Sequence, residues 1–242
     1  MWDLAGGVAV VTGAGSGIGR ELAKQLAREK MSLALADVNE TTLQETLSQI
    51  GNPCAPVSTH VVNVADLKQV EHFAADVLAR HKRVSLLINN AGVALHGTFE
   101  ELSIADLEWL MGINFWGMVY GVRNFLPVLK REPRSRIVNL SSILGSLALH
   151  ADPKSPIYGS KALAYDASKT ALNAFTVHLA AELKDTKIKV NSAHPGWVKT
   201  EMGTDAAPME IPDGAKTSVQ LALLSAGGPT GGYFHLGQTL PW

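Results

Sequence analysis

Short apolar runs alternate with amphipathic segments along the whole chain. An apolar run bounded by glycine, proline or polar residues is typical of a buried strand, and apolar positions spaced by three and four residues are typical of a helix. The runs predict strands at residues 8–11, 32–36, 57–62, 84–89, 136–140, 188–193 and 233–234. The amphipathic segments predict helices from the first glycine cluster to about residue 30 and at 66–81, 104–112, 114–130, 163–183 and 214–224.

This alternation predicts repeated βαβ units, and therefore a parallel sheet with helices on both faces. With 242 residues and 46% hydrophobic content, the chain is long enough to bury one full core. We therefore expect a single α/β domain, residues 1–242, with a doubly wound parallel sheet. In that architecture ligands bind beyond the C-terminal ends of the strands.

A glycine-rich turn follows the first predicted strand and opens the first helix. Glycine allows positive φ and lets a diphosphate approach main-chain N–H groups, while the helix N-terminus supplies a positive dipole. A turn of purely structural origin uses the same residues, so the spacing alone does not decide between the two interpretations. The turn reads Thr12-Gly13-Ala14-Gly15-Ser16-Gly17-Ile18-Gly19.

An aspartate, Asp37, ends the second predicted strand, 18 residues after Gly19. A dinucleotide-binding fold places at this point the carboxylate that accepts hydrogen bonds from the adenosine ribose. The alternative is a cap for the polar segment 39–41 that follows. Because a carboxylate repels a 2′-phosphate and no Lys or Arg lies within residues 12–19, we expect NAD(H) to be preferred over NADP(H).

Polar residues also follow three other predicted strands. Each group alone is compatible with a turn, but parallel strands end at the same edge of a sheet, so together they predict one site. The groups are Asn63-Val64, Asn89-Asn90-Ala91-Gly92 and Ser141-Ser142.

Tyr165 and Lys169 lie four positions apart on one face of a predicted long helix, and Ser142 ends the strand before it. A free phenol titrates near pH 10, so acid–base work near neutrality requires a lower pKa, which a nearby lysine and a nicotinamide cation can supply. A serine hydroxyl beside the phenol can hold a carbonyl oxygen. A Tyr and Lys at this spacing on a helix surface is otherwise a common structural pair.

These motifs, in this order, resemble the short-chain dehydrogenase/reductase family over nearly the whole chain. The resemblance implies a Rossmann fold, a nicotinamide cofactor, a homodimer or homotetramer built through the helices of Asn114 and Tyr165, and hydride transfer with Tyr165 as the acid or base. It implies catalytic roles for Asn114, Ser142, Tyr165 and Lys169. It implies cofactor binding by Gly13, Ser16, Ile18, Gly19, Asp37, Asn63, Val64, Asn90, Ala91, Gly92, Tyr165, Lys169, Pro195, Gly196, Val198 and Thr200.

The chain departs from the family pattern at two places. Ser142 and Tyr165 are 23 residues apart, and the excess, an insert at about residues 149–164, is expected to form a flap beside the substrate. The insert adds a competing pair, Tyr158 and Lys161, although Gly159 weakens a helix there. Asn63 stands where the family usually has aspartate and keeps an acceptor for the adenine amino group.

Composition and charge limit the partners. A formal net charge of −1 without charged blocks favours neither nucleic acid nor an anionic membrane as a partner. The single cysteine, Cys54, cannot form an internal disulfide, and neither His150 nor His194 has a second ligand at metal spacing, so we expect no metal site. The absence of a basic leader in Met1-Trp2-Asp3 and of a long apolar run leaves the cytoplasm as the expected location.

The sequence thus predicts an NAD(H)-dependent oxidoreductase that interconverts a hydrophobic ketone or aldehyde and its alcohol. Apolar residues near the predicted site, at 93–95 and 143–144 and at Trp197, favour a hydrophobic substrate. Two alternatives remain open: a reductase of 3-oxoacyl thioesters, and a non-catalytic NAD-binding sensor on the same fold.

Overall fold

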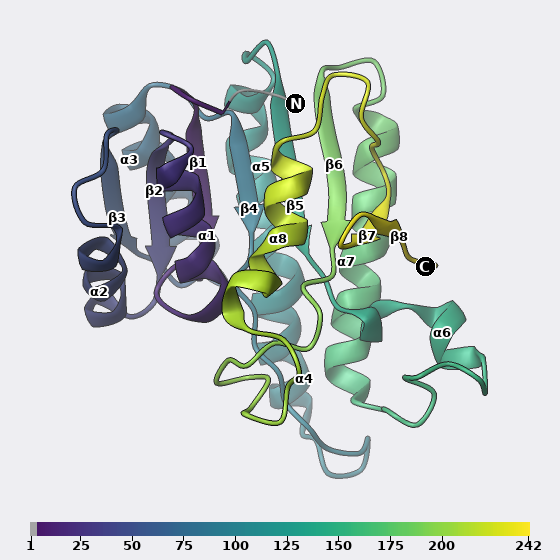
Figure 1. Ribbon diagram of the computed structural model, residues 1–242. Helices are drawn as coiled ribbons and strands as arrows, with labels where there is room; N and C mark the ends of the chain where they lie inside the picture. Colours follow the sequence, from purple (N-terminus) through teal and green to yellow (C-terminus); the bar gives the residue numbers. More distant parts are fainter. Residues whose placement is uncertain (1–3) are drawn as a thin grey trace.

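A central sheet organises the computed structural model, which describes residues 4–242 (Figure 1). Its strand order is β3-β2-β1-β4-β5-β6-β7-β8, with parallel pairing as far as β7 and antiparallel pairing of β8. The strands are β1 (Val8–Thr12), β2 (Ser32–Asp37), β3 (Val57–Val61), β4 (Leu86–Asn89), β5 (Ser135–Leu140), β6 (Ile188–Ala193), β7 (Tyr233–His235) and β8 (Gln238–Thr239). The order changes direction between β1 and β4, which confirms the predicted doubly wound α/β sheet in a single domain.

Helices cover both faces of the sheet (Figure 1). Helices α1, α2 and α8 contribute side chains to the core on one face, and α3, α5 and α7 contribute to the core on the other. Among the described residues the helices are α1 (Gly17–Arg28), α2 (Glu40–Ile50), α3 (Leu67–His81), α4 (Ile104–Met111), the π-helix η1 (Gly112–Trp116), α5 (Gly117–Leu129), the 3₁₀ helix η2 (Ile143–Gly145), α6 (Leu147–Ala151), α7 (Leu163–Glu182) and α8 (Ile211–Ala222).

Strand β1 shows how the sheet connects the two cores. Its five residues are all buried. Successive side chains of a strand point to opposite faces, so Val8 and Val10 enter one core while Ala9 and Val11 enter the other. A strand buried on both faces reads as a continuous apolar run, which is why the sequence predicted it well.

The differences from the predicted elements lie mostly at their ends. The strand predicted at 84–89 begins at Leu86, and the helix predicted at 214–224 begins at Ile211, where Pro212 occupies the first turn. Proline is suited to that position because its missing N–H has no partner there in any helix. The predicted helix 114–130 starts inside the π-helix η1, and α2 and α6 were not predicted.

The fold leaves the expected lack of a leader undecided. Residues 1–3, on which the expected lack of a leader rested, lie outside the described part of the chain. Within residues 4–242, no helix is both long and apolar enough to span a bilayer.

Candidate functional site

The strand order changes direction between β1 and β4, which end side by side, and this architecture has its ligand crevice at such a point. Gly13, just after β1, has φ of +65°, and a Cβ added there would meet the Ala91 Cα at 2.8 Å. The Asn90 side chain donates its Nδ2 hydrogens to the carbonyl oxygens of Thr12 and Gly13, at 2.8 and 3.1 Å. Asn90 therefore braces the glycine turn from the neighbouring strand, so a cofactor would meet a preformed loop.

The N-terminus of α1 opens on this crevice. Ser16 is its N-cap residue but makes no side-chain capping bond, and the first turn carries no acidic side chain. The first amides of a helix have no intrahelical partner and attract anions. A Cβ at Gly19 would lie 1.9 Å from the Gly13 carbonyl oxygen, so the turn closes this tightly only with glycine there. These features fit the diphosphate of a dinucleotide.

Asp37 reaches the same turn from the end of β2. Its Oδ2 accepts a hydrogen bond from the Gly15 amide at 2.8 Å, and its Oδ1 accepts one from the Asn39 amide at 3.1 Å. The cap of α2 is Asn39, whose side chain accepts from the Thr42 amide at 3.2 Å. The alternative prediction, Asp37 as a helix or turn cap for residues 39–41, is therefore confirmed for the turn, whereas the cap of the helix itself is Asn39.

Sequence reasoning missed Arg20, which follows Gly19 directly. Its Nε donates to the Gly15 carbonyl at 3.0 Å, and its Nη2 pairs with the Glu45 carboxylate at 2.8 Å. The guanidinium thus links the glycine turn to α2. The position of Arg20 directly after the last glycine of the turn could have indicated that its side chain contacts the turn.

Asn63 and Val64 follow β3, two strands away from β1. Asn63 is exposed, and its Oδ1 accepts from the Ala65 amide at 3.0 Å. Val64 is buried against η1 and α5, because a Cβ added to Gly117 would meet the Val64 side chain at 2.8 Å. Asn63 thus presents a polar side chain at this end of the crevice, above a rigid apolar base.

Ser142, Tyr165 and Lys169 come together although 23 residues separate the serine from the tyrosine. Ser142 follows β5, and its hydroxyl lies close enough to the Tyr165 phenol to act on the pKa of that phenol. Lys169, one turn along α7, is 4% exposed, and its Nζ lies 5.6 Å from the Tyr165 ring centre and donates to the Leu140 carbonyl at 2.9 Å. The three side chains thus gather at one place.

Burial favours the neutral form of both titratable groups in this cluster. It raises the pKa of Tyr165 to about 12, against the opposing Ser142 hydrogen bond and with a further contribution from the Asp166 charge. It lowers the pKa of Lys169 to about 8. Desolvation thus outweighs the lowering effect of Ser142 on the Tyr165 pKa. That Lys169 and a nicotinamide cation together lower this pKa stays a prediction.

Asn114 lies in the π-helix η1, an irregular stretch between α4 and α5. Its Oδ1 accepts from the Val93 amide at 2.8 Å, and its Nδ2 donates to the Val93 carbonyl at 2.9 Å and to the Ser168 hydroxyl at 3.0 Å. Ser168 in turn donates to the Tyr165 carbonyl at 2.7 Å. Gly92 leaves space between Asn114 and Lys169, whose polar atoms lie 3.3 and 3.5 Å from where its Cβ would be.

The loop after β6 crosses the crevice toward α1. Gly196 has φ of +93°, and a side chain at Gly17 would meet the Thr200 methyl at 3.2 Å. Val198 is buried, whereas Trp197 is exposed and donates its Nε1 hydrogen to the Gly203 carbonyl at 2.8 Å. The loop predicted from Pro195 to Thr200 therefore lies beside the glycine turn.

His194, which precedes Pro195, also ties that loop to the serine segment. Its Nδ1 accepts from the amides of Ile143 and Gly196, at 3.2 and 3.3 Å. Burial lowers its pKa to about 3, so the ring stays neutral and keeps its acceptor near neutral pH. Within residues 4–242, no group of three or more His, Cys, Asp or Glu side chains is placed to hold a metal ion.

The competing pair in the insert does not form on a helix. Helix α7 begins at Leu163, after Lys161, and Tyr158 lies in a turn with its side chain exposed. The Lys161 ammonium lies 5.2 Å from the Tyr158 ring centre and donates to the Tyr158 carbonyl at 2.6 Å. Tyr165 and Lys169 are thus the pair that shares a helix and faces Ser142.

Comparison with known proteins identifies the family. Residues 7–211 match the short chain dehydrogenase family. The chain belongs to this family. It is 35% identical over 208 residues to SadH of Mycobacterium tuberculosis, described as an oxidoreductase, covering 85% of this chain and 72% of the relative. It is 40% identical over 208 residues to retinol dehydrogenase 11 of Mus musculus, covering 83% and 64%.

Solved structures of the family superpose closely. An NADPH-bound carbonyl reductase from chicken fatty liver has a TM-score of 0.87 and 26% identity, with 99% of this chain and 100% of that one covered. A short chain dehydrogenase from Mycobacterium paratuberculosis, bound to NAD, has a TM-score of 0.84 and 25% identity, with 97% of each chain covered. The chain is therefore an oxidoreductase of this family, whose members include binders of either nicotinamide cofactor.

Proposed function

We propose that this chain interconverts a hydrophobic ketone or aldehyde and its alcohol with NAD(H), using Tyr165 as the acid or base. The observation that carries the proposal is the convergence of Ser142, Tyr165 and Lys169 beside the glycine turn, from segments far apart in the sequence. Such a constellation has no evident use in a protein that only senses a dinucleotide. We assign residues 1–242 to one dinucleotide-binding and catalytic domain.

The chemistry of the site follows from this arrangement. A bound nicotinamide supplies the hydride for reduction or accepts it in oxidation. Tyr165, neutral at pH 7 because of its raised pKa, gives its phenolic proton to the carbonyl oxygen, and Ser142 holds that oxygen by a hydrogen bond. In oxidation the phenolate must form, and the Lys169 ammonium beside it stabilises that charge. Asn114 borders the space through which a water can connect Lys169 to solvent.

The same residues outline the cofactor site. The amides after Gly13, with Ser16, Ile18 and Gly19, would receive the diphosphate, and Asp37 would accept from the adenosine ribose. Asp37 is a carboxylate in the position that a 2′-phosphate would approach, which supports NAD(H) over NADP(H). The adenine would lie against Asn63 and Val64, the nicotinamide ribose against Asn90, Ala91, Gly92, Tyr165 and Lys169, and the nicotinamide against Pro195, Gly196, Val198 and Thr200.

The proposal is tested by NADH and NADPH consumption against a panel of apolar ketones and aldehydes, with Tyr165→Phe beside the native chain. We expect turnover with NADH, and a loss of kcat of at least about a hundredfold in the variant, because general acid catalysis contributes that much. NADH binding, followed by its fluorescence, should remain, since the ring and Lys169 are still present. NADH binding without any turnover by the native chain would instead support a sensor.

A further inference from the structure

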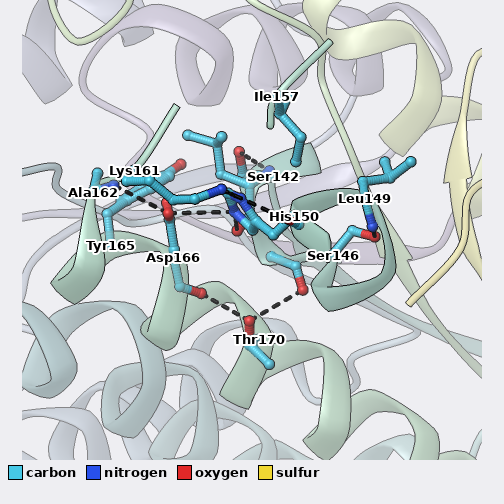
Figure 2. Close-up of polar contacts among 12 residues, drawn as sticks. Ser142, Ser146, Leu149, His150, Ile157, Lys161, Ala162, Tyr165, Asp166 and Thr170 are labelled. Atoms are coloured by element: carbon cyan, nitrogen blue, oxygen red, sulfur yellow. Dashed lines mark hydrogen bonds and ion pairs between the residues drawn. The ribbon is translucent and has the colours of Figure 1, made fainter. Parts of the chain in front are cut away.

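The insert between Ser142 and Tyr165 is fastened to the catalytic segments by one histidine. His150 lies in the last turn of α6, and its ring lies between Lys161 and Asp166 (Figure 2). The side chains of His150 and Asp166 are only 12% and 13% exposed, whereas Lys161 is exposed. The buried Asp166 Oδ1 has no hydrogen-bond partner among the described residues, so Asp166 is held in this cluster through its Oδ2 alone.

The hydrogen bonds define the state of the His150 ring. Lys161 has only hydrogens to donate, and its Nζ lies 3.0 Å from Nδ1, so Nδ1 is the acceptor. Nε2 therefore carries the hydrogen, and it points to the Leu144 carbonyl at 2.9 Å and to the Asp166 Oδ2 at 3.3 Å. The neutral tautomer with hydrogen on Nε2 satisfies all three contacts at once.

Two of these contacts, those to Leu144 and Asp166, lead to a candidate catalytic residue. Leu144 lies two positions after Ser142, whose hydroxyl accepts from the Leu144 amide at 3.3 Å. Asp166 follows Tyr165 directly and also accepts from the Ala162 amide at 3.1 Å, at the start of α7. His150 thus bridges the segment that carries the serine and the helix turn that carries the tyrosine.

We propose that His150 is a positioning residue of this oxidoreductase, which clamps the insert onto the Ser142 and Tyr165 segments and so holds the two hydroxyls together. The proposal rests on the proposed function for its catalytic readout. It assigns the insert a role that extends beyond forming a wall of the substrate pocket. Acid–base chemistry falls steeply when reacting groups move by about 1 Å, so a loosened clamp lowers kcat.

Charged groups surround the clamp on more than one side. The charged or titratable groups that bear on the cluster are Lys161 from the insert, Asp166 and Tyr165 from α7, and His96 from the loop after β4. Burial raises the pKa of Asp166, against the Ala162 hydrogen bond and the charges of His150, Lys161 and His96.

Two substitutions separate the clamp from general packing. His150→Gln places an amide N–H close to the Nε2 position and cannot be protonated near neutral pH, whereas His150→Leu keeps bulk but has no donor. We expect His150→Leu to lower kcat by about ten- to a hundredfold with unchanged NADH affinity. We expect His150→Gln to recover most of kcat, because its amide N–H can still reach the Leu144 carbonyl and the Asp166 carboxylate.

His178→Gln is the matched control, because this histidine is exposed on α7 and makes none of these contacts. It should match the native chain in kcat. A native kcat in His150→Leu, or a kcat in His150→Gln as low as in His150→Leu, would overturn the proposal. Should His150→Leu fail to fold, His150→Asn decides: its shorter amide falls short of the Leu144 carbonyl, so a native kcat in that variant would overturn the proposal.

A second measurement does not depend on turnover. Hydrogen–deuterium exchange of residues 147–162 at pH 7, without cofactor, should be faster in His150→Leu than in the native chain and in His150→Gln. Equal exchange in all three proteins would contradict the proposal that His150 clamps the insert. Absence of native turnover together with faster exchange in His150→Leu would count against the proposed function and leave the clamp standing.

Discussion

At the scale of single residues, burial keeps the Tyr165 phenol protonated and therefore able to act as an acid. Burial raises the pKa of Tyr165 to about 12 and lowers that of Lys169 to about 8, so at pH 7 the phenol is neutral and the lysine is mostly charged. This is the state needed to donate a proton. Above about pH 8 the lysine loses its charge, and with it the support for a phenolate.

Asp37 carries the residue-scale prediction on cofactor choice. We expect Asp37→Ala to raise the ratio of kcat/KM with NADPH to that with NADH by about tenfold, because the carboxylate no longer repels a 2′-phosphate. Steady-state kinetics with both cofactors measures the ratio. Asp37→Asn is the control, since its oxygen can still accept from the Gly15 amide while its charge is gone. An unchanged ratio in both variants would remove Asp37 from cofactor selection.

At the scale of elements, regular patterns were predicted well and irregular ones poorly. Strands buried on both faces and the long helix α7 were predicted from the local pattern of apolar residues. Helix α2 lies beside the glycine turn and has a weaker apolar stripe, with only Leu43 and Thr46 buried. The π-helix η1 depends on Asn114 reaching Val93 and Ser168, contacts that no local pattern contains.

The turn before α1 yields a prediction at this scale. In Gly19→Ala the added methyl meets the Gly13 carbonyl oxygen, so the turn must open, and we expect a loss of about 1–3 kcal/mol in the free energy of unfolding. NADH binding should weaken as well. Urea denaturation and NADH fluorescence measure the two effects. Gly159→Ala, in open space within the insert, should leave both near native values; equal stability of the two variants would contradict the prediction.

At the scale of the whole molecule, the reversal of strand order between β1 and β4 creates the crevice, and the exposed aromatic surface lies elsewhere. Trp116, in η1 ahead of α5, is 47% exposed, and Trp109 on α4 is 49% exposed. Trp116 also stacks on Tyr120. Large exposed aromatic side chains on one helical face favour contact with another subunit.

We therefore expect a dimer or tetramer in solution, assembled through the helices that carry Asn114 and Tyr165. Trp116→Glu should shift the mass measured by sedimentation equilibrium toward smaller species, since burying an unpaired carboxylate is costly. Val61→Glu, an equally surface-directed change on the edge strand β3, is the control and should not alter the mass. A native chain that sediments as a monomer would contradict the prediction.

The amino-acid sequence by itself indicated the family, the order of most strands and helices and most of the candidate site residues. These follow from local periodicity and from motifs whose spacing is written along the chain. Sequence also placed Tyr165 and Lys169 on one helix face, because helical geometry relates residues four apart.

Only the tertiary structure decided how those residues act on one another. The approach of Ser142 to Tyr165 across the insert, the exclusion of Tyr158 and Lys161 from α7, and the hold of His150 on Asp166 all depend on chain segments that meet by folding. The raised pKa of Tyr165 depends on burial, which is a property of the surroundings and not of the residue. The sequence specifies which chemical groups are present, and three-dimensional packing sets the distances between them, their solvation and hence their charge.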